Sequence, residues 1–151
     1  MTANGESTEL KEKYLRALAD RENLKKRMSG QIDQAVSKER REMLLSFIEV
    51  NDSLDQALRD RKEDGNEWIA GMKAVRRQFM EVLKRHGAEP FRAVGRSFDP
   101  QRHEAVGRES VPGYPEGAVL RVLRRGYVLS DGAVLRPARV IVTCSRENSI
   151  P

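Results

Sequence analysis

The chain has 151 residues, of which 34% are charged, 38% hydrophobic and only 5% aromatic, a composition typical of long exposed helices that excludes one compact core. Its apolar runs are only a few residues long and its one cysteine is Cys144, which excludes a membrane-spanning helix and an internal disulfide. We therefore expect a cytoplasmic protein of one or two small domains with no membrane partner.

Basic residues outnumber acidic ones by 28 to 23, a formal net charge of +5 that raises nucleic acid as a partner. The charges are interleaved, however, as in residues 38–42 (Lys-Glu-Arg-Arg-Glu), which is typical of the solvated face of a long helix. No aromatic side chains lie among the basic ones to stack bases. These two observations disfavour nucleic acid as a partner. A basic coiled-coil scaffold that binds nucleic acid is kept as the alternative hypothesis.

The first predicted element is a long helix that carries an apolar ribbon. The stretch 10–58 has no proline and one glycine, and its apolar residues recur in an eleven-residue repeat, about 3.67 residues per turn. At about 1.5 Å per residue such a helix reaches roughly 75 Å, so the ribbon needs a partner, most simply a second copy of the chain. The ribbon comprises Met28, Ile32, Val36, Met43, Phe47, Val50, Leu54 and Leu58, and from Ile32 onward its members are the expected dimer contacts.

The two ends of this helix differ. Residues 1–7 are expected to be disordered, with Ser7 or Thr8 as the helix cap. Arg21 and Lys25 interrupt the apolar steps and Gly30 has low helix propensity, so this half is expected to melt first. Near its other end a second apolar flank of Leu44, Leu45 and Ile48 predicts contact with a further neighbour.

That neighbour is a second predicted helix, after a charged turn at residues 59–66 with Asn66 as its cap. Its apolar residues recur at steps of three and four, and it ends at Gly87 with Pro90 beyond. A helical hairpin from Met43 to His86 cannot close a core, whereas two hairpins in a homodimer make a four-helix bundle. The expected dimer contacts on this helix are Trp68, Met72, Val75 and Phe79.

After Pro90 the pattern changes to short strands separated by turns. Clustered β-branched residues predict strands over 104–108, 119–124, 127–129 and 139–143. The expected organisation is a tail at 1–7, helices over 8–88, a compact β domain over 89–144 and a tail at 145–151. The fold class is α+β, with a coiled-coil helix and hairpin followed by a small, mainly β domain.

Two blocks of this domain carry a resemblance to a known family. They read FDPQRHEAV from Phe98 and GYVLSDGAVLRPARVIV from Gly126. In that order and spacing they resemble the GrpE family, the nucleotide exchange factors of DnaK-type heat-shock chaperones. The segments YLRALADRENLKKR (14–27), LLSFIEVNDSLDQAL (44–58) and GMKAVRRQFMEVLKRHGAEP (71–90) are similar to the family's helices, so the likeness covers nearly the whole chain.

The resemblance implies a homodimeric co-chaperone that binds the ATPase domain of such a chaperone and accelerates ADP release. It implies chaperone contacts at the helix-to-strand junction and on the β domain: Arg85, Gly87, Pro90, Leu123, Arg124, Tyr127, Asp131 and Arg136. One departure is Ala133, which stands where the family usually has an arginine. If that arginine touches the chaperone in relatives, Arg124, Arg125 or Arg136 would have to supply the contact here.

Alternative chemistry has little support in the residues. Asp99, His103 and Glu104 lie close together, but a metal site needs more ligands, and a turn in which Asp99 accepts backbone N–H bonds is favoured. Cys144 has no histidine placed to activate it, and the glycines form no phosphate-binding loop. We therefore expect no catalytic, cofactor-binding or metal-binding residues, and no enzyme.

Overall fold

The structure is a computed structural model, and it describes residues 3–59 and 67–144. These residues fall into two compact units, divided between Glu42 and Met43. The division lies inside the first helix. The helical hairpin and the β domain, which the sequence analysis separates near residue 88, therefore belong to one unit.

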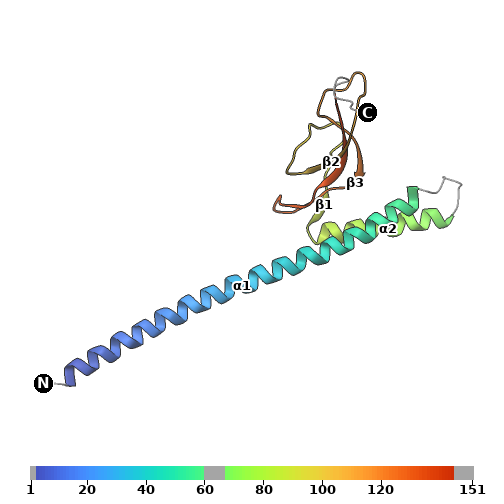
Figure 1. Ribbon diagram of the computed structural model, residues 1–151. Coiled ribbons are helices and arrows are strands. Elements are labelled where there is room, and N and C mark those ends of the chain that lie inside the picture. Colours follow the sequence, from blue (N-terminus) through green and yellow to red (C-terminus); the bar gives the residue numbers. More distant parts are fainter. Residues whose placement is uncertain (1–2, 60–66, 145–151) are drawn as a thin grey trace. The chain divides into compact units, whose positions relative to one another are not determined.

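Helix α1 (Ala3–Arg59) supplies the whole described part of the first unit (Figure 1). It begins at Ala3, so the expected cap at Ser7 or Thr8 is wrong: both residues lie inside the helix, in a stretch without proline that nothing interrupts. Lys13 and Glu9 form an ion pair at 2.6 Å one turn apart, the kind of contact that supports an exposed helix. Every side chain described from residue 7 to residue 40 is exposed, so this segment has no packing within its own unit.

The second unit contains the end of α1 and helix α2 (Glu67–Arg85), which confirms the predicted pair of helices. Leu44 and Ile48 of α1 are buried, as the second apolar flank predicts, and they share a core with Leu83 of α2. The ring of Phe47 meets that of Phe79 edge-on, with centroids 6.1 Å apart. Of the charged turn expected at residues 59–66, Arg59 is the last residue of α1, and residues 60–66 with the expected cap Asn66 lie outside the described residues.

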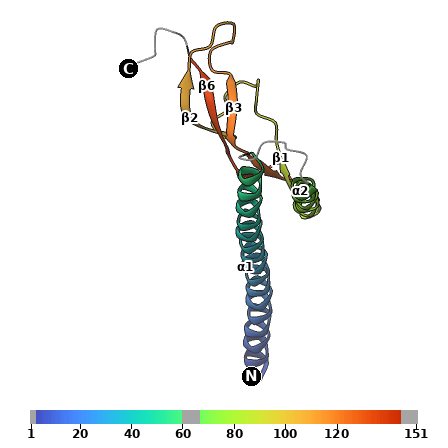
Figure 2. The same cartoon turned by 90° about the vertical axis from the view of Figure 1, so that its right-hand side faces the viewer.

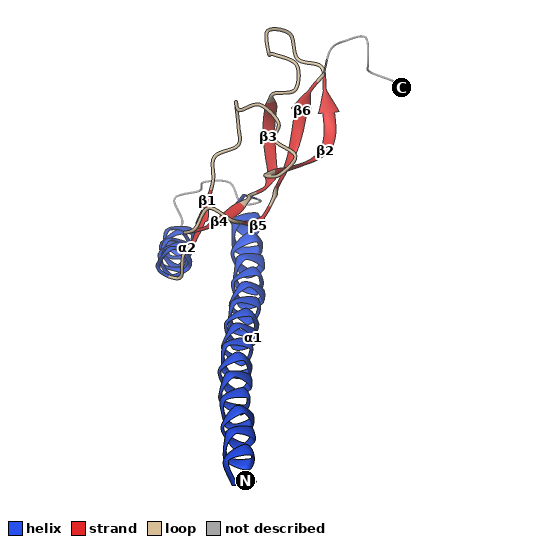
Figure 3. Ribbon diagram, turned by 90° about the vertical axis from the view of Figure 1, so that its left-hand side faces the viewer, coloured by secondary structure: helices blue, strands red, loops and turns tan. Residues whose placement is uncertain are grey.

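Two three-stranded sheets follow the helices. The first has the order β1-β4-β5, all antiparallel, and Figure 3 shows its strands beside the two helices. The second has the order β2-β6-β3, with β6 in the centre, parallel to β2 and antiparallel to β3 (Figure 2). The strands are β1 (Ala88–Pro90), β2 (His103–Glu109), β3 (Val119–Arg124), β4 (Tyr127–Leu129), β5 (Val134–Arg136) and β6 (Ala138–Thr143).

The sequence predicts β2, β3, β4 and β6 closely, but it misses β1 and β5. Both missed strands have only three residues, too few for an alternating pattern, and β1 ends in proline. Each pairs with β4, which lies between them. The first sheet therefore depends on pairing across the chain and has almost no local signal.

Two apolar clusters hold this unit together. In the first, Tyr127 and Leu135 of the first sheet pack with Leu44, Ile48 and Leu83 of the helices, so the β domain and the hairpin share one core. The second lies on the β2-β6-β3 sheet and contains Ala93, Val119, Ala138, Val140 and Val142, with Phe91, Phe98 and Val122 against it. We refer to the first cluster as the first core; it attaches the β domain to the helices.

Candidate functional site

The expected contact residues come from three places, the junction after α2, the β4–β5 hairpin and β3, and the first sheet brings the first two together. The junction after α2 supplies Arg85, Gly87 and Pro90. In the β1–β4 register Ala88 lies opposite Leu129, and Pro90 opposite Tyr127. The Ser130 hydroxyl also donates to the Gly87 carbonyl across 3.4 Å. The junction and the β4–β5 hairpin are therefore neighbours, although some forty residues separate them in the chain.

The junction has the geometry of a helix end. Gly87 has φ +81°, in the left-handed region that suits glycine, and its N–H donates to the Lys84 carbonyl at 2.9 Å. This confirms Gly87 as the residue that ends α2. Gly87 is itself buried, whereas Arg85 and Pro90 on either side of it are exposed. The glycine sets the path of the chain into β1, and its neighbours form the surface.

The hairpin turn between β4 and β5 is closed by its own hydrogen bonds. The Leu129 N–H donates to the Ala133 carbonyl at 2.8 Å, and Gly132 takes φ +85°. The Asp131 carboxylate accepts the Ala133 N–H at 2.9 Å. Asp131 and Ala133 are exposed, so this turn presents a fixed surface loop.

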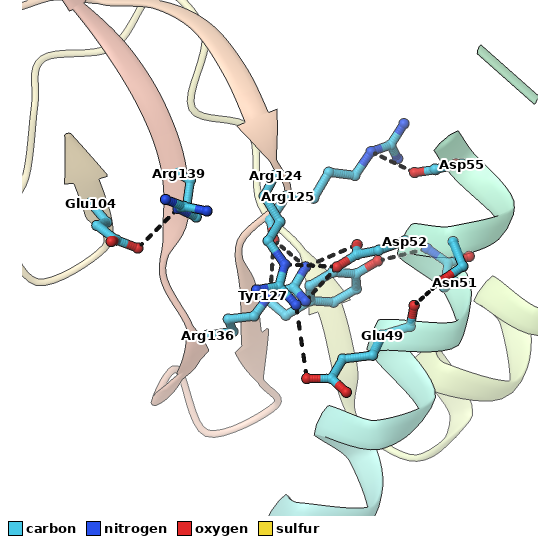
Figure 4. A network of polar contacts seen from close by, with 11 residues as sticks. Glu49, Asn51, Asp52, Asp55, Glu104, Arg124, Arg125, Tyr127, Arg136 and Arg139 are labelled. Carbon is cyan, nitrogen blue, oxygen red and sulfur yellow. Dashed lines mark hydrogen bonds and ion pairs between the residues drawn. The ribbon is translucent and has the colours of Figure 1, made fainter. Parts of the chain in front are cut away.

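An ion-pair cluster joins the β domain to α1, centred on Asp52 (Figure 4). Arg136 holds the carboxylate with both arms, Nη1 to Oδ2 at 2.6 Å and Nη2 to Oδ1 at 3.0 Å. Arg124 Nε donates to Oδ2 at 2.9 Å. Arg136 also donates to the Arg125 carbonyl at 2.7 Å, which ties β5 to the end of β3. A two-armed arginine–carboxylate pair fixes orientation as well as distance.

The two arginines control the protonation of Asp52. Burial by itself raises the pKa of this carboxyl, but the hydrogen bonds and positive charges of Arg136 and Arg124 outweigh burial and lower the pKa below its ordinary 3.8. Asp52 is therefore ionised at neutral pH. A second carboxylate one turn further on, Asp55, is paired with Arg76 of α2 and, at 3.4 Å, with Arg125.

Tyr127 adds a buried contact between the β domain and the helices. Its ring is fully buried, and its hydroxyl accepts a hydrogen bond from the Asn51 amide at 3.1 Å and lies 3.6 Å from the Met80 sulfur. Arg136 lies over the ring, with its guanidinium carbon 5.4 Å from the centroid. Burial and the coulombic effect of Asp52 raise the pKa of the tyrosine.

These positions correct two of the expected direct contacts. Tyr127 is inaccessible because it is buried in the core between sheet and helices. The Arg136 side chain is only 11% exposed and is engaged with Asp52. Both residues hold the β domain on α1 instead of presenting a surface. Arg124 and Arg125 also pair with carboxylates of α1, but about two fifths of each side chain stays exposed.

Four of the expected contact residues are exposed. Leu123 is 51% exposed on β3, so a partner could cover this large apolar side chain. Arg85, Pro90 and Asp131 are exposed at the junction and the hairpin turn. We refer to Arg85, Pro90, Leu123 and Asp131 as the candidate contact set.

The apolar ribbon is also exposed. Its members Ile32, Val36, Met43, Phe47 and Val50 are 43–63% accessible. Leu54 and Leu58 are half-buried. On α2, Trp68 and Val75 are about half exposed, whereas Met72 and Phe79 are half-buried and Phe79 packs on the chain's own first core. A continuous series of large exposed apolar side chains is characteristic of a surface that a partner covers.

The Asp99–His103 block is a structural turn, as the sequence analysis favours. The Asp99 carboxylate accepts the Gln101 N–H at 2.9 Å, and the Asp99 N–H donates to His103 Nδ1 at 3.0 Å. His103 is buried, and burial lowers its pKa although the nearby Asp99 charge opposes that effect. Among the residues that the structure describes, no three His, Cys, Asp or Glu side chains gather as a metal site would require.

Two further expectations concern Cys144 and membranes. Cys144 is half-buried directly after β6, where its N–H donates to the Glu109 carbonyl at 3.1 Å. Neither α1 nor α2, as far as each is described, has the length of apolar sequence that crossing a bilayer takes.

Comparison with known proteins agrees with this architecture. A family model described as GrpE matches residues 2–144. Protein GrpE of Legionella pneumophila (strain Corby) is 37% identical over 134 residues, which cover 87% of this chain and 66% of that protein. Protein GrpE of Methanosarcina barkeri is 38% identical over 136 residues, 88% of this chain and 65% of the relative. Protein GrpE of Syntrophobacter fumaroxidans is 33% identical over 134 residues, which cover 87% of this chain and 70% of that protein.

The fold and the site define an α+β protein. The end of its long helix α1 and helix α2 form a hairpin, and a β domain is attached to this hairpin by a shared core and an ion-pair cluster. The chain belongs to the GrpE family. It spans about two thirds of the length of the Legionella and Methanosarcina relatives.

The arginine cluster was only partly foreseen from the sequence. Arg124, Arg125 and Arg136 were singled out as substitutes for a missing contact, but Asp52, Asp55 and Asn51 were not. A signal for them does exist. Buried Leu44 and Ile48 continue at steps of three and four into Asn51 and Asp55, so the buried face of α1 becomes polar where the arginines meet it.

Proposed function

We propose that this protein is a non-enzymatic nucleotide exchange factor, which binds the ATPase domain of a DnaK-type heat-shock chaperone and accelerates ADP release. The observation that carries the proposal is the GrpE family match over residues 2–144. The fold supports it, because the hairpin and the β domain form one unit that can act as a rigid docking element.

The proposed mechanism is a shift in the population of chaperone conformations. The exchange factor binds more tightly when the nucleotide cleft of the chaperone is open, so its binding favours the open state and ADP leaves faster. Linkage then requires added nucleotide to weaken the complex by the same factor. No bond is made or broken by the exchange factor in this mechanism.

The proposed contact surface is the candidate contact set. Leu123 is its large apolar member, on β3, and Arg85, Pro90 and Asp131 are exposed on elements that the first sheet joins. Arg124 remains a proposed contact through the part of its side chain that stays exposed. Gly87, Tyr127 and Arg136 hold these residues in place from beneath.

The proposed active form is a homodimer. The exposure of the ribbon supports this form, because residues 7–40 have no packing in their own unit while large apolar side chains stand on that helix. Two hairpins would then pair as a four-helix bundle through the exposed faces of Phe47, Val50, Trp68 and Val75. Each β domain would remain attached to its own hairpin through the first core.

The test is the release rate of a fluorescent ADP analogue from a purified DnaK-type chaperone, measured by stopped flow with and without this protein. We expect faster release with the protein, and a Leu123→Asp variant that loses most of the acceleration. Val106→Asp is the matched control, since Val106 is also an exposed apolar residue of the β domain but lies outside the contact set. Unchanged release with the unmodified protein would refute the proposal.

A further inference from the structure

A second surface feature of the β domain is a cleft of about 590 Å³, lined by residues between β1 and the start of β2, which the proposed function does not use. Its walls include Arg92, Arg96 and Arg102, together with the side chains of Ser97 and Asp99. The volume is within the range of small-molecule sites. The three arginines come from two separate segments, so the site is formed by the fold and not by a single run of basic residues.

Both segments are fixed to the second sheet by backbone hydrogen bonds. The Gly95 N–H donates to the Val119 carbonyl at 2.9 Å, and the Val119 N–H donates to the Arg96 carbonyl at 2.8 Å. On the other side, the Ala138 N–H donates to the Arg102 carbonyl at 2.9 Å. The two walls therefore hold the backbone positions of these arginines at a set separation, which lowers the entropy cost of binding a ligand between them.

The cleft is also lined by two packed rings. Phe91 and His103 have centroids 6.0 Å apart, and the Arg102 guanidinium carbon lies 5.8 Å from the Phe91 centroid. A Cβ added to Gly126 would collide with the Phe91 ring, so the absence of a side chain at Gly126 is what lets this ring take its place. Arg102 is thereby held over a ring that cannot easily move.

The charges in the cleft do not balance. Three guanidinium groups face one carboxylate, that of Asp99, which already accepts the Gln101 N–H. Within residues 3–59 and 67–144, neither Arg92 nor Arg96 is paired with a carboxylate, whereas Arg124, Arg125 and Arg136 all are. A net excess of two positive charges in one cleft is complementary to a dianion.

We propose that this cleft binds a phosphoryl group, as inorganic phosphate or as the phosphate of a small monoester. Arginine forks suit phosphate oxygens because each can donate two parallel hydrogen bonds, and a phosphate dianion matches the charge excess where a single carboxylate would not. The Ser97 hydroxyl adds a neutral donor at the wall. This inference does not depend on the exchange activity.

The experiment is a titration of the full chain with inorganic phosphate, AMP and adenosine, followed by isothermal calorimetry and by backbone amide NMR at constant ionic strength. We expect saturable binding of phosphate or AMP with a Kd on the order of 1 mM or tighter, and none of adenosine. Shifts should centre on residues 92–103. Phosphate and AMP bound equally would identify the phosphoryl group alone as the ligand, whereas tighter AMP would indicate a monoester.

Two double variants with equal charge change test the site. Arg92→Gln/Arg96→Gln should weaken phosphate binding about ten-fold or more, because charge-assisted hydrogen bonds are lost. Arg108→Gln/Arg121→Gln, also on the β domain but outside the cleft, should leave binding within about two-fold, since screened surface charges act weakly. Equal weakening by both pairs would overturn the proposal, as would binding of an oligonucleotide without any binding of phosphate or AMP. Native amide spectra of both variants would exclude misfolding as the cause.

Discussion

Asp52 of α1 and Arg136 of β5 form a two-armed ion pair, at 2.6 and 3.0 Å, between residues 84 positions apart in the chain. Arg124 meets the same carboxylate from β3. The pair fixes the direction in which the β domain leaves the hairpin. In the proposed function it therefore determines where the contact set is presented to the chaperone.

Removing the Asp52 carboxylate should loosen the β domain. We expect Asp52→Ala to lower the free energy of unfolding by about 2 kcal/mol, because Arg136 is left largely buried without its counter-ion. The unfolding free energy of the second unit, obtained from a urea titration, measures this effect. Glu49→Gln is the control: Glu49 is exposed and 3.9 Å from Arg124, so it should cost less than about 0.5 kcal/mol. Equal effects of the two changes would contradict the assigned role of Asp52.

The same carboxylate predicts an acid dependence. The pKa of Asp52 is lower in the folded chain than its ordinary 3.8, so the unfolded chain binds this proton more readily. The stabilisation is therefore complete above that ordinary value, and it is lost as pH falls through the lower folded value. Unfolding free energies measured between pH 6 and pH 3 should decline more steeply for the unmodified chain than for Asp52→Asn. Parallel curves would show that the carboxylate is not stabilised by its arginines.

The buried hydroxyl of Tyr127 should contribute to stability, because it accepts a hydrogen bond inside the core that the β domain shares with the helices. Tyr127→Phe removes the acceptor of the Asn51 amide and leaves that buried amide without its partner. We expect a loss of about 1–3 kcal/mol in unfolding free energy. If Tyr127 instead touched the chaperone directly, the change would slow nucleotide release while leaving thermal stability unaltered. Calorimetric melting of the variant distinguishes the two outcomes.

Replacing glycine by alanine should have opposite signs at two positions. Gly30 is inside α1 with no atom within 4 Å of an added Cβ, so Gly30→Ala should stabilise the helix by about 1 kcal/mol. The first melting step followed by circular dichroism should move upward. Gly87 has φ +81°, which strains any L side chain, so Gly87→Ala should destabilise the second unit by about 1 kcal/mol. Shifts of the same sign would contradict this assignment.

The helices and most strands could be predicted because their signals are local. The steps of three and four around Leu44 and Ile48 reveal a buried flank, and β-branched runs such as that ending at Thr143 reveal strands. The interface at Asp52 has a weaker signal: Asn51 and Asp55 continue the buried steps after Ile48, but those steps do not show which residues cover them. From the sequence alone, an aspartate that pairs with distant arginines looks the same as one exposed to solvent on a charged helix. The partners of Asp52, Arg124 and Arg136, are more than seventy residues away.

The burial of Tyr127 also has no local signal in the sequence, for a related reason. The resemblance placed it in a block associated with chaperone contact, but alternation along a three-residue strand cannot tell which face is covered. Its burial follows from Asn51, Met80 and the first core, which only the folded chain brings together.

The central claim is that the exposed apolar ribbon is covered by a second copy of the chain in the form that acts on a chaperone. Light scattering coupled to size-exclusion chromatography, at micromolar concentration and with circular dichroism of the same fraction, tests it most directly. The account predicts a single species of twice the 17.2 kDa chain mass with high helix content. A monodisperse species of one chain mass, with its helix intact, would contradict it.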